Sequence, residues 1–345
     1  MKQLQIQGAS GTSTILVGEP LRQLTRYLPQ QDLVIISDEN VAKHYAGQFP
    51  DGQVIAIGTG EAVKTLETVQ QIYAELVTVE ADRSCCIVGI GGGIVCDVAG
   101  FVASTYLRGV RFGFVATTLL AQVDASVGGK NGVNFGGYKN MVGTFNQPDF
   151  VLCDLEMLSS LPKEQLQCGF AEIVKHAAIA DAGMLAYLEQ NAGRALDLDL
   201  EVIEYLVHQS LVIKSTIVNQ DEKETGKRRM LNFGHTFGHA IETVTGVPHG
   251  QAVSIGMVLA AGLSRQHGMI TSTEEDRIVA LLERLQLPTR MNFDHAAVLE
   301  ALGKDKKRKG AQMHFVLLNG LGRAEVVEIA LSDLRGSLSR FVLAE

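Results

Sequence analysis

The sequence predicts an α/β domain built on a mostly parallel sheet, followed by a mainly α-helical domain. Up to about residue 155, short apolar runs alternate with helical patterns, which is the rhythm of parallel strands joined by helices. From about Ser159 onward, helical patterns dominate and strand signals nearly vanish until residue 313. Glycine is abundant at 36 residues and proline scarce at 7, as expected for many tight strand-to-helix turns. We therefore predict two domains, residues 1–155 and 156–345.

The strands of the first domain are predicted from short, continuous apolar runs. Between the second and third of these runs, residues Glu61–Val79 carry apolar side chains at helical spacing. Strand, helix and strand in this order predict a Rossmann-like sheet with helices on both faces. The predicted strands are Leu33–Ser37, Val54–Ile57, Cys85–Ile90, Phe112–Ala116 and Phe150–Cys153.

The second domain is predicted to be a set of helices that ends in a hairpin of two strands, Met313–Leu318 and Arg323–Ile329. No repeat or low-complexity linker separates the two halves, so we expect them to pack tightly and to bind a ligand in the cleft between them. The predicted helices are Lys163–Ile179, Met184–Gln190, Leu200–Asn219, Gly234–Thr245, Gln251–His267, Thr273–Leu285 and Ala296–Ala301.

The composition argues against nucleic acid and membranes as partners. The net charge is −8, whereas a nucleic-acid binder is usually basic. The basic clusters Lys227–Arg229 and Lys304–Lys309 lack the interleaved aromatic residues of single-strand binders, so we expect them to be solvated or to hold a small anion. No apolar run has the length of a membrane span, and the first residues lack the apolar core of a signal peptide.

Five cysteines form no CxxC motif, and four of them lie in apolar, strand-like runs. Because the total of five is odd and most of the cysteines lie in apolar runs, we predict reduced core cysteines in a cytoplasmic protein.

A glycine cluster at Gly89–Gly100, GIGGGIVCDVAG, follows a predicted strand and opens a predicted helix. Glycines in this place let backbone N–H groups approach a pyrophosphate. The strict GxGxxG spacing fails because Ile94 stands at the third glycine, so a tight turn without a ligand is the alternative. Asp38 and Asn40, just after the first strand, are placed to bind a ribose hydroxyl, although a helix cap is the simpler reading of Asp38.

The segment Ala116–Asn140 is long and punctuated by glycines, and we expect it to be an irregular functional loop. It carries Lys130, Lys139 and Asn140, which suit a phosphate, together with Asp124. A surface loop with solvated lysines is the alternative.

Acidic residues and histidines cluster in the second half. The stretch LNFGHTFGHAIE places His235, His239 and Glu242 at i, i+4 and i+7, which share one face of a helix and suggest a metal or an anion. Glu172 lies on an apolar helix beside Lys175 and His176, where a surface ion pair would be the simpler reading, and His249 precedes another helix. Together with His235, His239 and Glu242, the residues Glu172 and His249 offer enough ligands for a divalent metal with an open coordination position.

Eight segments in series resemble the 3-dehydroquinate synthase family, over residues from about 33 to 320. They are GGGIVCDVAGF, STYLRGVRF, TTLLAQVDASVGGK, YKNMVGTFNQP, CGFAEIVK, DEKETGKRRMLNFGHTFGHAIE, HGQAVSIGM and DKK.

The resemblance implies a lyase of the shikimate pathway, which leads to chorismate and the aromatic amino acids. Such an enzyme converts 3-deoxy-D-arabino-heptulosonate 7-phosphate to 3-dehydroquinate and phosphate. The expected steps are oxidation at C5 by NAD, β-elimination of phosphate, reduction by the same NADH, ring opening and intramolecular aldol closure. A divalent metal, Zn²⁺ or alternatively Co²⁺, would polarise the C5 oxygen.

The resemblance also assigns roles to individual residues and corrects the first interpretation of the two histidines. Glu172, His235 and His249 would hold the metal, whereas His239 would lie near the substrate phosphate with Lys130 and Asn140. Glu242 would at most contact a metal ligand. Lys175 would lie beside the metal, and Asp124 would hydrogen-bond the substrate.

The remaining roles implied by the resemblance concern the substrate's other groups and the cofactor. Lys214, Arg228 and Asn232 would bind the carboxylate end and ring hydroxyls, and Lys306 or Lys307 would close the anion site. Arg108 would reach the phosphate of a second subunit, which implies a homodimer. NAD would be surrounded by Asp38, Asn40, Glu61, Lys64, Gly92, Gly93, Asp97, Thr117, Thr118 and Lys139.

The chain departs from the family pattern at a few positions, none of them an expected metal ligand or phosphate binder. Cys96 and Ala116 stand where the family usually has glycine and proline, and these departures bear on the packing around NAD. Gln251 replaces a frequent glutamate near His249, which puts the metal affinity in doubt. Asn131 and Gln165 are further departures.

Three alternatives stay open. Sister sugar phosphate cyclases include aminodehydroquinate, 2-epi-5-epi-valiolone and 2-deoxy-scyllo-inosose synthases. The last two act on substrates without a carboxylate, and Lys214, Arg228 and Asn232 argue against them. A metal-dependent polyol dehydrogenase would release NADH. A regulator that binds NAD and metal without catalysis would release no phosphate.

Overall fold

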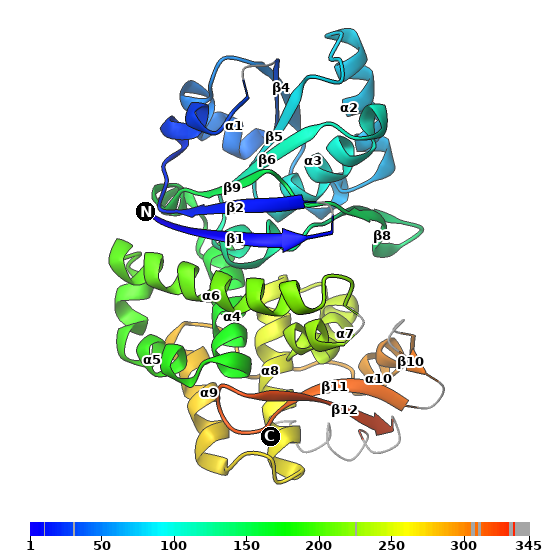
Figure 1. Ribbon diagram of the computed structural model, residues 1–345. Coiled ribbons are helices and arrows are strands. Elements are labelled where there is room, and N and C mark those ends of the chain that lie inside the picture. Colours follow the sequence, from blue (N-terminus) through cyan, green and yellow to red (C-terminus); the bar gives the residue numbers. More distant parts are fainter. Residues whose placement is uncertain are drawn as a thin grey trace. The chain divides into compact units, whose positions relative to one another are not determined.

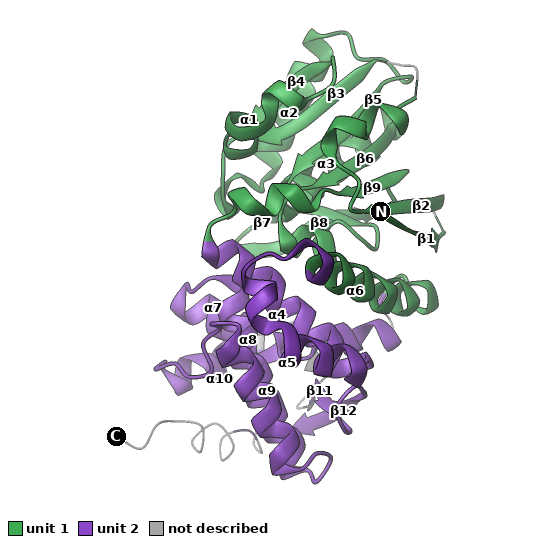
Figure 2. Cartoon of the chain, turned by 90° about the vertical axis from the view of Figure 1, so that its left-hand side faces the viewer, with its two compact units in different colours: residues 1–162, 203–223 green, residues 163–202, 224–345 purple. Residues whose placement is uncertain are grey.

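The computed structural model describes residues 1–9, 11–29, 32–224, 226–304, 308–309, 312–330 and 334. By contacts the chain forms two compact units, unit 1 (Met1–Pro162 and Ile203–Lys223) and unit 2 (Lys163–Val202 and Glu224–Glu345), which Figure 2 draws in green and purple. The single boundary predicted at residue 155 places residues 203–223 in the second domain, whereas by contacts they belong to unit 1. The division into domains of residues 1–155 and 156–345 stays a prediction.

Unit 1 contains a seven-stranded sheet in the order β1-β2-β9-β6-β5-β3-β4 (Figure 1). All neighbouring strands are parallel except β1 and β2, which form an antiparallel hairpin. The five predicted strands and their parallel order are confirmed. The strands are β1 (Lys2–Gly8), β2 (Gly11–Val17), β3 (Leu33–Asp38), β4 (Gln53–Ile57), β5 (Cys86–Gly91), β6 (Arg111–Ala116) and β9 (Phe150–Cys153).

The N-terminal hairpin was absent from the prediction because β1 is largely polar, with Ile6 as its one buried residue. Strand β1 lies beside α6 (Leu200–Gln220), whose residues from 203 onward belong to unit 1. The amino terminus pairs with Glu204 at 3.0 Å, and the Gln7 N–H donates to Asn219 Oδ1 at 3.3 Å. A helix far along the sequence therefore completes the edge of the first unit.

The core of unit 1 lies on the central parallel strands, whose buried residues are nearly all apolar, as expected for a sheet covered on both faces. One face carries a cluster that includes Ile35, Val88, Val115 and Leu152. The other helices of the unit are α1 (Glu39–Tyr45), α2 (Leu66–Thr78) and α3 (Gly93–Thr105), with short helices η1 (Leu21–Arg26), η2 (Ala46–Gln48), η3 (Glu61–Val63), η4 (Tyr106–Arg108) and η6 (Leu155–Ser160).

The continuous helix predicted over Glu61–Val79 is wrong at its start. The segment divides into η3 and α2, because the Thr65 hydroxyl accepts the Thr68 N–H and begins a new helix. This division leaves Lys64 between the two helices, where it is buried.

The expectation of an irregular loop over Ala116–Asn140 is also wrong. The segment forms a π-helix, η5 (Ala121–Ala125), and most of a hairpin of β7 (Lys130–Phe135) and β8 (Tyr138–Phe145). The many glycines hide the strand pattern, and two of them, Gly136 and Gly137, form the turn with positive φ values of 59° and 81°.

Unit 2 is mainly helical, as predicted, and ends in the predicted antiparallel hairpin of β11 and β12. A short strand, β10, pairs with β11. The elements are α4 (Lys163–Ala180), α5 (Ala182–Leu196), η7 (Lys227–Asn232), α7 (His235–Thr245), α8 (His249–Gln266), α9 (Ser272–Arg284), α10 (His295–Lys304), β10 (Arg308–Lys309), β11 (Gln312–Leu318) and β12 (Ala324–Ala330).

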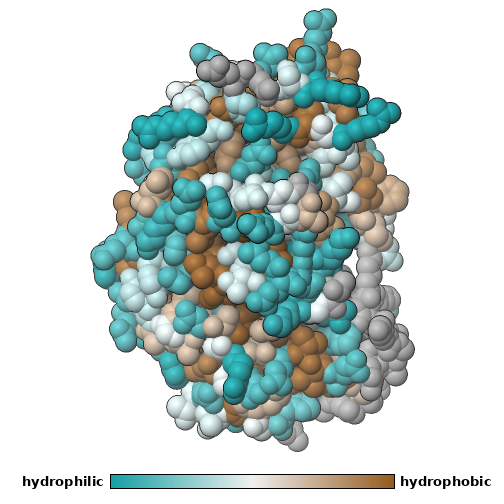
Figure 3. Space-filling view, viewed as in Figure 1, coloured by the Kyte–Doolittle hydropathy of each residue, from teal (hydrophilic) through white to brown (hydrophobic). Residues whose placement is uncertain are grey.

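Hydrophilic side chains cover most of the face drawn in Figure 3, and apolar ones appear between them in smaller groups. Among the residues that the structure describes, no helix combines the length and apolar character needed to cross a bilayer.

Candidate active site

Three buried or half-buried side chains meet in unit 2, each from a different helix. Glu172 of α4 has its Oε1 3.3 Å from His235 Nε2 and 3.5 Å from His249 Nε2. The ligand atoms of the three residues all lie within 4.8 Å of one another. One carboxylate and two imidazoles that converge in this way are a set of donors for a divalent metal.

Glycines bring the three helices close enough for this contact. A Cβ placed on Gly250 would lie 2.4 Å from the Cys168 Cα, so the start of α8 rests directly on α4. A Cβ on Gly256 would lie 2.0 Å from the Gly234 carbonyl oxygen, which brings α8 against the start of α7. Gly234 itself has a φ of 77°, a conformation that L side chains rarely adopt.

Both histidines are oriented through the ring nitrogen that faces away from Glu172. The Nδ1 of His235 lies 3.2 Å from the Phe233 carbonyl oxygen, and the Nδ1 of His249 lies 3.2 Å from Glu242 Oε2. Since a carbonyl or carboxylate oxygen only accepts, each Nδ1 carries the proton. The Nε2 of a neutral ring is then left as the metal-binding atom.

The charges of the cluster suit a metal. Burial alone would raise the pKa of Glu172, but Lys175, His235 and His249 hold that pKa well below its usual range. Burial lowers the pKa of His235, against the opposing charge of Glu172. Burial would also lower the pKa of His249, but hydrogen bonds to Glu172 and Glu242 raise it to about 9. A bound cation would therefore replace a proton at His249.

The interpretation that His235, His239 and Glu242 act together on one helical face is wrong in its detail. Glu242 contacts His249 of the next helix, not a metal position. His239 is exposed, and its ring lies 5.2 Å from the His235 ring at 89°. The pair therefore places one histidine in the cluster and the other beside it.

Lys175 forms an ion pair with Glu172, one turn away on α4, and both side chains are almost fully buried. A buried cation and anion at this spacing compensate each other. The surface ion pair that the spacing alone favoured is thus excluded.

The residues of η7 and the preceding loop lie near the start of α7. Arg228 is buried, and Asn232 Nδ2 donates to Glu224 Oε1 at 2.6 Å. Glu224, whose φ is 58°, did not stand out in the sequence because it lies within the charged run DEKETGKRR. The predicted residues Lys306 and Lys307 lie outside the described residues.

In unit 1, Lys214 of α6 and Asp124 of the π-helix are brought together across 90 positions of the sequence. The Lys214 Nζ donates to both the backbone oxygen and the Oδ1 of Asp124, at 2.5 Å each. The π-helix presents the two oxygens of Asp124 to the same ammonium group, which fixes both side chains.

A second group in unit 1 joins residues that the resemblance assigned to NAD and to phosphate. The buried Lys64 forms an ion pair with Asp97 and donates to Asn140 Oδ1 at 2.6 Å. Burial raises the pKa of Asp97, although Lys64 opposes that effect. Asn134 connects this group to Glu61, because its Nδ2 donates to Glu61 Oε1 at 2.8 Å and its Oδ1 accepts the Asn140 N–H at 2.9 Å.

The glycine cluster forms a close-packed cradle at the start of α3. A Cβ on Gly92 would lie 3.0 Å from Thr118 Cγ2, and one on Gly93 would lie 2.9 Å from Ala125 Cβ. Thr117 N–H donates to the Gly91 carbonyl at 3.0 Å, and its buried hydroxyl has no hydrogen-bond partner within the described residues. A bound nucleotide would supply such a partner.

The other predicted residues of unit 1 differ in how far they are fixed. Asp38 caps α1 by accepting the Val41 N–H at 2.9 Å, so the helix-cap reading is confirmed; Asn40 is exposed. Lys130 and Lys139 are exposed on the β7–β8 hairpin. Arg108 is exposed with a φ of 69°, after Leu107 with a φ of 48°. Two successive non-glycine residues in the left-handed region of backbone conformation indicate a strained turn. Strained backbone of this kind often occurs at functional sites.

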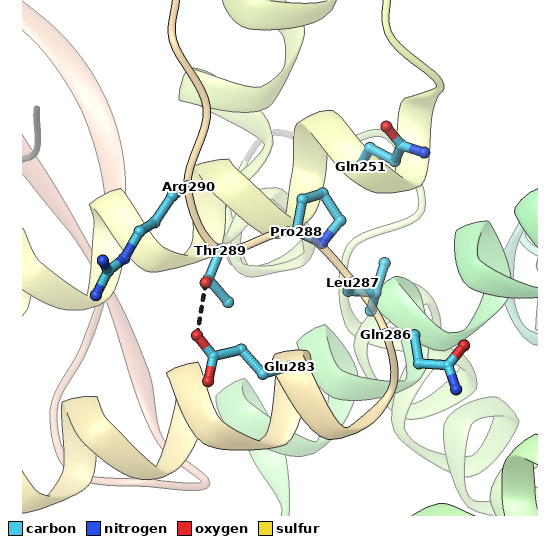
Figure 4. A pocket seen from close by; sticks show the side chains of 7 residues that line it. All are labelled: Gln251, Glu283, Gln286, Leu287, Pro288, Thr289 and Arg290. Carbon is cyan, nitrogen blue, oxygen red and sulfur yellow. Dashed lines mark hydrogen bonds between the residues drawn. The ribbon is translucent and has the colours of Figure 1, made fainter. Parts of the chain in front are cut away.

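A separate pocket of about 530 Å³ lies in unit 2 between the start of α8 and the end of α9 (Figure 4). Its lining includes Gln251, and the Thr289 hydroxyl donates to Glu283 at 2.9 Å across it. None of the predicted catalytic, cofactor or metal residues lines this pocket. It is therefore distinct from the metal cluster and from the groups of unit 1.

Comparison with known proteins identifies the family of the chain. Residues 54–168 match the model of the 3-dehydroquinate synthase N-terminal region, and residues 169–308 match that of its C-terminal region. A 3-dehydroquinate synthase of Pelobacter propionicus is 39% identical over 343 residues, which are 95% of this chain and 96% of the relative. One of Methylococcus capsulatus is 42% identical over 335 residues, which are 94% and 93% of the two chains.

Among solved structures, a 2-deoxy-scyllo-inosose synthase complexed with carbaglucose-6-phosphate, NAD⁺ and Co²⁺ has the same fold. It aligns with a TM-score of 0.85 and 25% identity, over 99% of this chain and 100% of the other. The two family models and the near full-length relatives show that the chain belongs to the 3-dehydroquinate synthase family.

Proposed function

We propose that this protein is a 3-dehydroquinate synthase, which converts 3-deoxy-D-arabino-heptulosonate 7-phosphate to 3-dehydroquinate and phosphate. The observation that carries the proposal is the Glu172–His235–His249 cluster, which has the ligand types of a catalytic metal site and consists of the three residues that the resemblance assigned to the metal. Relatives that match nearly the whole chain and have this name support it.

A divalent metal fits the cluster. Two ligands about 2.1 Å from a tetrahedral ion lie roughly 3.4 Å apart, and the Glu172 oxygen lies 3.3 and 3.5 Å from the two imidazole nitrogens. Three protein ligands leave a position open for substrate. We propose Zn²⁺, with Co²⁺ as the alternative that is bound in the related inosose synthase.

NAD fits the cradle of unit 1. Gly92 and Gly93 form the N-terminus of α3, and the N-terminus of a helix offers backbone N–H groups to a pyrophosphate. The Thr117 hydroxyl beside it is a buried polar atom without a hydrogen-bond partner among the described residues. The proposed cofactor residues are Asp38, Asn40, Glu61, Lys64, Gly92, Gly93, Asp97, Thr117, Thr118 and Lys139.

When bound, NAD supplies a hydride acceptor that is regenerated in the cycle, and the metal supplies a Lewis acid for a substrate oxygen. The chain's own residues bind and orient an anionic substrate. In the proposal, Lys130, Asn140 and His239 bind the phosphate, and Lys214, Arg228 and Asn232 bind the carboxylate and hydroxyls. The structure supports fixed positions for Lys214 and Asn232, which are held by Asp124 and Glu224.

Further parts of the proposal concern assembly and location. We propose a homodimer in which Arg108 contributes to the partner's phosphate site, and a cytoplasmic enzyme. The strained, exposed turn at Arg108 is the observation that favours a role outside its own fold.

The test is phosphate release from 3-deoxy-D-arabino-heptulosonate 7-phosphate with NAD⁺ and Zn²⁺, run beside sedoheptulose 7-phosphate. Many turnovers per NAD⁺ with no net NADH are expected from the first substrate. Release from the second alone would place the chain with the valiolone-type cyclases and would remove the carboxylate assignments. NADH accumulation on simple polyols without phosphate release would instead indicate a dehydrogenase.

A further inference from the structure

Gln122 lies in the π-helix η5 and is fully buried at the carboxyl ends of the central strands. Its Nε2 donates to the Ala116 carbonyl at 3.0 Å and to the Asp154 carbonyl at 2.8 Å. Ala116 is the last residue of β6, and Asp154 directly follows β9, the neighbouring strand. One side-chain amide therefore ties the ends of two parallel strands to the π-helix.

The amide oxygen of Gln122 has no hydrogen-bond partner within the part of the chain that the structure describes. A buried, unpaired oxygen costs free energy, and the two hydrogen bonds donated by the amide nitrogen offset that cost. Only an amide supplies two such donors at this length: an ionised glutamate offers none, and a methionine fills the same space without hydrogen bonds.

The π-helix carries or contacts the groups to which we assigned cofactor and substrate. Thr118 precedes it: the Thr118 hydroxyl accepts the Ala121 N–H at 3.1 Å, and its carbonyl accepts the Gln122 N–H at 2.9 Å. Ala125 closes against Gly93 of the cradle. Between them, Asp124 holds Lys214 through two of its oxygens.

We propose that Gln122 is a positioning residue that sets the π-helix against the glycine cradle and so fixes the NAD site of unit 1. The proposal rests on the proposed function, because it takes Gly92, Gly93, Thr117 and Thr118 as the cofactor residues. Without the amide, two buried carbonyls lose their donor, and Thr118 and Ala125 lose the anchor that holds them against Gly92 and Gly93.

The experiment compares wild type with Gln122→Met and Gln122→Glu in the full, zinc-loaded chain. NAD⁺ affinity is measured by titration calorimetry, Zn²⁺ affinity by chelator competition, and folding by thermal unfolding. The matched control is Gln167→Glu in unit 2, where a buried glutamine also donates to a backbone carbonyl, that of Gln286 at 2.5 Å, and no proposed NAD residue is near in the sequence.

Both Gln122 variants are expected to bind NAD⁺ at least ~10-fold more weakly than wild type, since loss of one or two hydrogen bonds corresponds to such a factor. Their Zn²⁺ affinity should not change, because the metal ligands belong to unit 2. Gln167→Glu should leave NAD⁺ affinity unchanged. A general loss of structure would lower the affinities for both NAD⁺ and Zn²⁺. Weaker NAD⁺ binding with unchanged Zn²⁺ binding therefore identifies a positioning role.

Wild-type NAD⁺ affinity in folded Gln122→Met would overturn the inference. Failure of both variants to fold, with a folded control, would also overturn it, because Gln122 would then serve the stability of unit 1 alone. Absence of NAD⁺ binding in the wild type would instead refute the proposed function, which the inference presupposes.

Discussion

Gly250→Ala tests whether close packing of helices α8 and α4 sets the metal site. The added Cβ would lie 2.4 Å from the Cys168 Cα and 2.9 Å from its backbone nitrogen. Carbon atoms in contact are usually ~3.5–4.0 Å apart, so the start of α8 must move by roughly 1 Å. Because the obstacle is backbone, no side chain can rotate away to make room.

The shift would act on His249, the residue before Gly250. Metal–ligand distances are held to about 0.2 Å, whereas a movement of roughly 1 Å would take the His249 Nε2 away from its present position 3.5 Å from Glu172. Loss of a hydrogen-bond partner of a metal ligand lowers metal affinity about 10–100-fold. Because displacement of a ligand itself is a larger change, we expect Zn²⁺ affinity to fall by at least ~100-fold. Overpacking should also lower the free energy of unfolding by about 1–3 kcal/mol.

The assay combines chelator competition for Zn²⁺ with denaturant unfolding of the metal-free protein. Gly193→Ala is the matched control, because Gly193 lies in helix α5 of the same unit and a Cβ there meets nothing within 4 Å. This control should be stabilised by about 0.5–1 kcal/mol through helix propensity. Wild-type metal affinity and stability in Gly250→Ala would refute the reasoning from packing.

Three further predictions concern single side chains. Glu242→Gln should weaken Zn²⁺ binding ~10-fold in chelator competition, because the charged partner of His249 Nδ1 is lost; an equal effect of Glu189→Gln, which alters only the Arg277 pair, would contradict this. Arg228→Ala should raise KM for the natural substrate at least ~10-fold in steady-state kinetics, through loss of a buried guanidinium; an unchanged KM would remove the carboxylate assignment. Thr271→Ala should lower the free energy of unfolding by about 1 kcal/mol at pH 7, because it removes the N-cap of α9. Hydrogen bonds from the Thr271 N–H and hydroxyl lower the pKa of Glu274, and alanine removes only the one from the hydroxyl. The contribution of that bond is present above about pH 4.3 and is lost as the pH falls through the lowered pKa. The difference between wild type and Thr271→Ala should therefore shrink in acid unfolding curves, and a constant difference would argue against the capping box.

The sequence pattern located most strands and helices because each depends on the local spacing of apolar residues. Leu33–Ser37 became β3, Phe150–Cys153 became β9 and the late hairpin formed as expected. The pattern failed at the glycine-rich segment that forms the π-helix and the β7–β8 hairpin, where strand pairing, not periodicity, determines the structure. It also failed at Lys64, where a cap at Thr65 divides the helix.

The sequence by itself also determined the chemical types of the candidate site, namely a carboxylate, imidazoles, lysines and a glycine cluster, and the family to which the chain belongs. The resemblance assigned Glu172, His235 and His249 to one metal, but residue spacing alone could not select them, and only the tertiary structure brings these groups together. His235 and His239 are one turn apart, yet Glu172 and His249 come from other helices, and they determine which imidazole joins the cluster. Lys214 likewise reaches Asp124 only through the return of α6 to unit 1. Spacing along a chain defines one face of one helix, whereas a ligand set requires several elements, and their approach depends on packing at residues such as Gly250.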